Sequence, residues 1–129
     1  MNKINEITTR TTKIWLDDVG IIHSLGLPGV DHSLEDAINI VKAIVAVSEG
    51  KARPLLSDIR QIKSIDREAR QHLADSEIND VVLANAVMVD SPLSRMIGNF
   101  FNGFNKPPIP LKLFSDESEA VNWLLEFMK

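Results

Sequence analysis

Apolar and polar positions along the chain switch between the two-residue period of strands and the three-to-four-residue period of helices. Residues 8–16 and 21–25 are rich in β-branched and aromatic types and predict two strands. Asp17, Asp18 and Gly20 form a turn between them, so we expect an N-terminal antiparallel hairpin. Three further strands are predicted from Pro54 to about Asp58, over residues 84–89 and over residues 109–114.

Helical periodicity fills the segments between these later strands. Ser33 followed by Asp36 resembles a capping box, and apolar residues then recur every three or four positions. Gly50 is placed to end that helix in a left-handed cap. The other three helices are expected to begin at Asp66, at Ser91–Pro92 and at Asp116 with Glu119.

This alternation of strands and helices predicts an α/β domain with a mixed, five-stranded sheet and about four helices. Strands buried on both faces tend to be continuous apolar runs, whereas these are interrupted by polar residues. We therefore expect the helices to cover mainly one face of the sheet, in an order that the sequence does not reveal. The interrupting residues are His23, Ser24, Ser57, Asp58, Asn85 and Lys112.

Composition narrows the class of protein. A length of 129 residues is typical of a single domain, here expected to span residues 1–129. A net charge of −4 does not provide the basic face that nucleic-acid binding requires. No apolar run approaches the roughly 20 residues of a membrane span. There is no cysteine and no apolar leader, so a cytoplasmic protein is expected.

No pattern in the sequence indicates catalysis. His23, His32 and His72 are isolated from one another and lack the spacing of metal ligands, so no metal site is expected. Residues 28–33, PGVDHS, contain one glycine and no lysine, unlike a phosphate-binding loop. No G-x-S-x-G element is present to expose a nucleophilic serine. We therefore expect no cofactor and no enzymatic activity.

Charged residues are concentrated around the central strand and the helix after it. They would form either a solvated edge whose charges pair with one another or a docking surface for an acidic or phosphorylated partner. The candidate partner-binding residues are Asp58, Arg60, Lys63, Ser64, Asp66, Arg67 and Arg70.

The helix after Pro92 carries a stripe of large apolar residues at helical spacing. The stripe would be the core face of the helix, or part of it would form a dimer surface or line a pocket for an apolar ligand. Phe104, the last of the stripe, is the residue expected to be exposed, and a homodimer would use it. The candidate residues are Met96, Phe100, Phe101 and Phe104.

Residues 55–70, LLSDIRQIKSIDREAR, resemble the signature region of STAS domains, the family of bacterial anti-anti-sigma factors and sulphate-transporter C-terminal domains. Asp58 matches the aspartate at the strand end, and Asp66 matches the aspartate that caps the helix. The phosphorylatable serine and the glycine of that family are absent, because residues 67–69 are Arg-Glu-Ala. The nearest hydroxyl, that of Ser64, is expected to bond its own backbone in a turn.

Over nearly its whole length the chain is similar to small uncharacterised bacterial proteins with a SpoIIAA-like fold. The matching segments include PLLSDIRQIKSI, SPLSRMIGNFFNGFNKP and IPLKLFSDESEAVNWL. The resemblance implies a β/α superhelix with a mixed sheet and does not supply a mechanism. The first function expected is a non-catalytic protein-interaction or regulatory module of STAS type that binds an unidentified protein. The alternative is a binder of a small apolar or lipid-like ligand, suggested by the phenylalanine helix and by kinship of the fold with SEC14-like domains.

Overall fold

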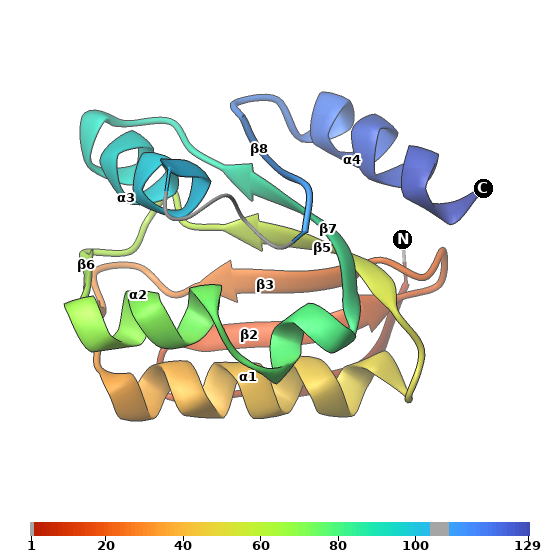
Figure 1. Cartoon of the computed structure of the whole chain (residues 1–129), viewed down its shortest axis with the longest axis horizontal. Helices are drawn as coiled ribbons and strands as arrows, with labels where there is room; N and C mark the ends of the chain where they lie inside the picture. The colour runs from red at the N-terminus through yellow and green to blue at the C-terminus, as the bar shows by residue number, and fades with distance from the viewer. Residues whose placement is uncertain (1, 104–108) are drawn as a thin grey trace.

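A computed structural model describes residues 2–103 and 109–129, with only the backbone described for residues 100–103. Its main sheet has six strands in the order β1-β2-β3-β5-β7-β8 (Figure 1). The first three strands are antiparallel, and β3, β5, β7 and β8 run parallel to one another. Their bounds are Lys3–Thr8 (β1), Thr12–Asp17 (β2), Ile22–Gly26 (β3), Arg53–Asp58 (β5), Val82–Met88 (β7) and Leu111–Phe114 (β8).

A second, two-stranded sheet pairs the short strands β4 (Asp31–His32) and β6 (Ser64–Ile65) in parallel. It ties the segment before α1 to the segment before α2. The α-helices are α1 (Leu34–Ser48), α2 (Arg67–Ala74), α3 (Pro92–Gly103) and α4 (Glu117–Leu125). Two short 3₁₀ helices follow α2 and α4 along the chain, η1 (Glu77–Asp80) and η2 (Glu126–Met128).

The mixed α/β fold class is confirmed, and the sheet has one strand more than predicted. All six residues of the additional strand, β1, are exposed, and its apolar residues Ile4 and Ile7 are three positions apart. A register shift lies between these two isoleucines, and Asn5 between them has φ 53°. Because the bulge breaks the two-residue period, the sequence pattern did not indicate a strand.

The first predicted strand began too early for a related reason. Residues 8–16 were expected to be one strand, but β2 begins at Thr12. The hydroxyl of Thr9 accepts the backbone N–H groups of Thr11 and Thr12 at 3.3 and 3.0 Å. The β-branched threonines that suggested a strand are therefore partly used to build the turn between β1 and β2.

The predicted helix starts and the predicted end of α1 agree with the structure, with two differences in detail. Ser33 and Asp36 form a capping box, and the Asp116 carboxylate accepts the Glu119 N–H. Asp66 is the N-cap residue of α2, but its side chain makes no capping hydrogen bond. Helix α1 already turns left-handed at Glu49, with φ 58°, one residue before the predicted Gly50.

The helices divide between the two faces of the sheet. Helix α1 packs on β2 and β3 with α2 beside it, whereas α4 packs on β5, β7 and β8 (Figure 1). Successive residues of β5 face opposite ways, since Leu55 joins the core under α1 and Leu56 the core under α4. Helix α3 lies on the same face as α1. Its Gly98 lies beside Leu113 of β8, which faces the same way as Leu111, two residues earlier, and Leu111 lines a cavity together with residues of α1. Three of the four α-helices thus cover one face of the sheet.

Within the described ranges, no helix is long and apolar enough to cross a membrane.

Candidate functional site

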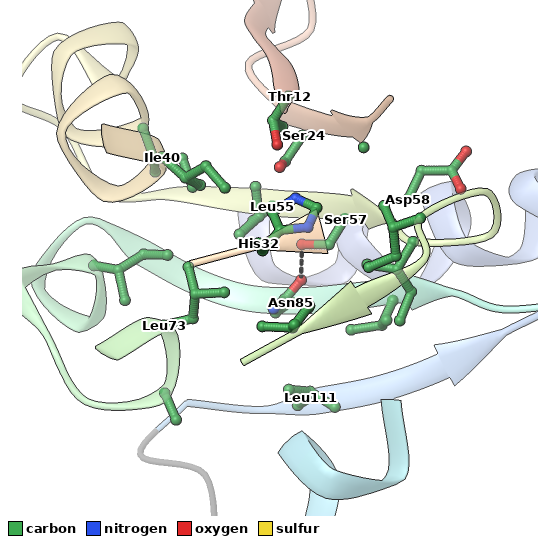
Figure 2. A pocket seen from close by; sticks show the side chains of 18 of the residues that line it. Thr12, Ser24, His32, Ile40, Leu55, Ser57, Asp58, Leu73, Asn85 and Leu111 are labelled. Carbon is green, nitrogen blue, oxygen red and sulfur yellow. Dashed lines mark hydrogen bonds between the residues drawn. The ribbon is translucent and has the colours of Figure 1, made fainter. Parts of the chain in front are cut away.

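A cavity of about 330 Å³ lies on the face of the sheet that α1 and α2 cover. Figure 2 shows side chains from β2, β3, β5, β7 and β8 on one side of this cavity and side chains from the helices opposite them. Most of the wall is apolar. Its aliphatic residues are Ile40, Ile44, Leu55, Ile59, Ile62, Ile65, Leu73, Ala74, Ile78, Val87, Ile109 and Leu111.

The cavity exists because the sheet presents short side chains where a filled core would have large ones. Ser24 of β3 lies opposite Ser57 of β5, and Gly26 follows on β3. Asn85 of β7 lies diagonally across from Ser57. Ser24, Ser57 and Asn85 are half-buried although their strands are in the middle of the sheet. The remaining exposure of these interior residues shows that the space above them is accessible from outside.

Two of these polar side chains bond each other. The Ser57 hydroxyl donates to the Asn85 side-chain oxygen at 2.8 Å, as Figure 2 shows. With its carbonyl occupied, the amide of Asn85 keeps two N–H donors, which have no hydrogen-bond partner among the described residues. The hydroxyl of Ser24 is likewise unpaired within the described part of the chain. The cavity therefore contains polar groups able to bond a ligand.

His32 contributes a neutral ring to the same wall. Its side chain is buried, and Nδ1 lies 3.1 Å from the backbone oxygen of Ser64. Since a carbonyl only accepts, Nδ1 carries the proton and Nε2 is left as an acceptor. Burial lowers the pKa of His32 below its ordinary value, against the raising effect of the Ser64 hydrogen bond, so the ring is uncharged at neutral pH.

An ion pair between the exposed Arg10 and the buried Asp36 holds the segment that carries His32. The Asp36 carboxylate accepts from Nε and Nη2 of Arg10 at 3.0 and 2.6 Å, and from the backbone N–H and hydroxyl of Ser33 at 2.9 and 3.0 Å. Arg10 also donates to the backbone oxygen of Asp31 at 2.7 Å. The Arg10 hydrogen bond keeps the pKa of Asp36 well below its ordinary range. The pair fixes β4 and the start of α1 against the β1–β2 turn.

The charged residues on the cavity wall are acidic. Asp58 and Asp75 line it, and no lysine or arginine does so in the described ranges. Arg60 binds Asp58 in a bidentate manner, with Nε and Nη2 donating at 3.0 and 2.7 Å. This hydrogen bond with Asp58 raises the pKa of Arg60. Asp58 is thus neutralised locally, and Asp75 is exposed to solvent at the end of α2.

The predicted partner-binding residues do not form a single surface. Asp58 lines the cavity and pairs with Arg60, as the self-paired interpretation predicted. Lys63, Asp66 and Arg67 are exposed around the start of α2. They therefore form a smaller patch than the sequence suggested.

The other two residues of that prediction also have different surroundings. The prediction that Ser64 bonds its own backbone is wrong, because its hydroxyl donates to the Asp31 carboxylate at 2.5 Å across the β4–β6 pair. Strand pairing, which the local sequence did not indicate, brings these residues together. Arg70 is half-buried on α2 rather than part of the exposed patch.

The candidate apolar surface on α3 is described only in part. Met96 is 63% exposed, while Ile97 beside it is buried. The side chains of Phe100 and Phe101, and all of Phe104, lie outside the described residues. The homodimer that would use Phe104 therefore stays a prediction.

The sequence analysis missed the combination of Ser24, Ser57 and Asn85 with His32 and the Arg10–Asp36 pair. The three polar strand residues were noticed as interruptions, and that was the available signal. Their meaning depends on strand order and register, which place them on one face of adjacent strands. Arg10 and Asp36 are 26 positions apart and carry no local pattern that would link them.

Comparisons with known proteins give a family and a fold. A family described as "Domain of unknown function (DUF7793)" matches residues 14–128. A solved structure of an uncharacterised protein from the DUF3478 family of Shewanella loihica PV-4, with a SpoIIAA-like fold, is similar with a TM-score of 0.54. The two sequences are 16% identical, and the match covers 95% of this chain and 92% of that one. A search of curated proteins gives no match.

Proposed function

The chain belongs to the DUF7793 family, and we propose that it binds a small, largely apolar ligand in the cavity between the sheet and helices α1 and α2, without catalysing a reaction. In the sequence, the phenylalanine helix and the kinship of the fold with SEC14-like domains suggested this function as the alternative. The cavity and its polar floor now support it better. A SpoIIAA-like fold is compatible with this role but does not specify it.

The cavity itself is the observation that carries the proposal. Protein interiors are close-packed and contain few voids larger than a water molecule. A cavity of about 330 Å³ lies at the lower end of the roughly 300–1,000 Å³ typical of small-molecule sites. Its mostly aliphatic wall with a few convergent polar groups is the usual composition of such a site.

The arrangement of polar groups favours binding over catalysis. Nucleophilic catalysis requires a base within hydrogen-bond reach of the nucleophile. The hydroxyl of Ser57 instead donates to the amide of Asn85, which is not a base. The Nδ1 proton of His32 is directed to the backbone of Ser64, and no carboxylate hydrogen-bonds this ring among the described residues. These groups are suited to orienting a ligand.

A regulatory, protein-binding module of STAS type without the phosphorylatable serine is the second candidate. The observation that favours it is the exposed patch of Lys63, Asp66 and Arg67 beside the β4–β6 pair. Neither Lys63 nor Arg67 forms an ion pair within the described part of the chain. An acidic partner would bind this patch without a covalent switch, and Arg67→Glu would abolish that binding while leaving the cavity unchanged.

Native and denaturing mass spectrometry of the purified protein tests the proposed function. We expect a small apolar molecule to be retained in the native spectrum and lost on denaturation. Ala74→Phe would place a ring in the cavity and should abolish retention, whereas Ala52→Phe on an exposed loop should not. A wild-type protein that retains nothing and also fails to bind an uncharged fluorescent dye such as phenylnaphthylamine would contradict the proposal.

A further inference from the structure

We propose that the ligand is uncharged and carries one hydrogen-bonding group, of the alcohol or amide class, that bonds Asn85 at the floor of the cavity. This inference rests on the proposed function and specifies the chemistry of its ligand. It follows from three features of the same wall: the orientation of one amide, the distribution of charge and the tautomer of one histidine.

The orientation of Asn85 determines which atom it offers. Its side-chain oxygen accepts the Ser57 hydroxyl at 2.8 Å, so the amide nitrogen is the group left for a ligand. A ligand that fills the cavity would shield this N–H donor from water, and a buried donor without a partner is costly. A ligand oxygen placed above β7 would satisfy it. The Ser24 hydroxyl on β3, which shares this face, can donate or accept a second hydrogen bond.

The distribution of charge argues against an anionic ligand. The only charged side chains that line the cavity in the described ranges are the carboxylates of Asp58 and Asp75. A carboxylate or phosphate group inside would lose its hydration without gaining a cation. His32 does not supply one, because burial keeps its ring neutral. A fatty-acid anion is therefore a poor match for this wall.

The cavity wall is no better suited to a cationic ligand. The Asp58 carboxylate is already bound by both Nε and Nη2 of Arg60. Asp75 is exposed, so solvent screens its attraction for a buried ammonium group. The other polar groups on the wall are neutral: hydroxyls, the amides of Asn79 and Asn85, and the Nε2 acceptor of His32. An alcohol or primary amide can both donate to and accept from such groups, and it needs no counter-ion.

The test compares three probes of equal chain length, decanol, decanoate and decylamine, as competitors of phenylnaphthylamine bound to the full chain at neutral pH. We expect decanol to displace the dye at a concentration about tenfold lower than either charged probe, since burying an unpaired charge is unfavourable. Equal potency, or a more potent charged probe, would overturn the inference while leaving the proposed function standing. If neither the dye nor decanol binds, both are wrong.

Variants at Asn85 locate the polar contact. Asn85→Leu removes the donor and should weaken decanol about tenfold while dye binding changes little, as expected for one lost buried hydrogen bond. The matched change Asn122→Leu, on the exposed face of α4, should have no effect on either. If decanol binds Asn85→Leu as well as it binds the wild type, the proposed contact is wrong.

A second variant keeps the test decisive if the leucine protein does not fold. Asn85→Asp has nearly the same shape, but it replaces the N–H donors by a carboxylate. It should reverse the preference, so that decylamine displaces the dye at a lower concentration than decanol. An Asn85→Asp protein with the wild-type preference would show that this side chain does not contact the polar end of the ligand.

Discussion

The two faces of the sheet differ in how completely they are filled. Under α4 the strands contribute Ala84, Ala86 and Met88 of β7, whose small or flexible side chains let the helix pack closely. Leu124 of α4 is fully buried there. Under α1 and α2, Ser57 and Asn85 face a cavity of about 330 Å³.

The difference arises within single strands. Leu56 and Ser57 are neighbours on β5, and Ala86 and Val87 are neighbours on β7, yet each pair divides between the filled face and the cavity face. Because successive side chains of a strand point to opposite faces, one strand serves two purposes. The α4 face contributes packing energy, whereas the α1 face gives up part of that energy to keep a space for a ligand.

The largest effect should come from removing a filled-face side chain. Leu124→Ala removes a fully buried leucine and should lower the free energy of unfolding by about 2–5 kcal/mol. Leu73→Ala, on the half-buried wall of the cavity, should cost about 1 kcal/mol, because solvent already reaches that wall. Denaturant unfolding measures both. Equal losses would show that the two faces are packed equally well.

Enlarging a side chain should also distinguish the two faces, because only the cavity face has room for added volume. Ala86→Leu would press on α4 and should destabilise the fold by about 1–3 kcal/mol. Val87→Leu, on the next residue of the same strand, extends into the cavity and should change stability by less than about 1 kcal/mol. Thermal unfolding of the two variants checks this, and a more harmful Val87→Leu would contradict the assigned cavity.

Acid should loosen the cavity face first. The pKa of Asp36 is lowered in the folded state, so its contribution to stability is complete above its unfolded pKa of about 4 and is lost as the pH falls below that value. Asp36→Asn should remove this part of the acid sensitivity and cost about 1 kcal/mol at neutral pH through the weakened cap. Unfolding curves at a series of pH values test it. An unchanged acid dependence in the variant would show that Asp36 does not contribute.

The smallest effect should appear at milder pH. Burial lowers the pKa of His32, so the unfolded chain binds a proton before the folded one does. Stability should therefore decline as the pH falls through the ordinary histidine pKa of about 6.5, and it should level off below the folded pKa. His32→Gln should flatten that decline. NMR titration of the ring would measure its pKa directly, and a value above the ordinary one would contradict the assignment.

Local sequence patterns predicted the helices and strands, whereas the pairing of strands distant in sequence determines the candidate site. The Ser33–Asp36 capping box and the Asp116 cap could be predicted because their partners are three residues apart. The Ser57–Asn85 bond joins residues 28 positions apart and depends on the register of β5 and β7. No sequence period encodes that register. For the same reason, Ser64 was assigned to a turn although it pairs with the Asp31 segment.

Strand β1 lies at the margin of the sheet, and in the described part of the chain no strand pairs with its outer side. An open margin with exposed apolar residues such as Ile4 and Ile7 is a template on which other chains can add strands and aggregate. The bulge at Asn5, together with the exposed charges of Lys3 and Glu6, disrupts the flat row of backbone groups that such growth requires. The irregularity that hid this strand from pattern analysis is thus also a protection against fibril formation.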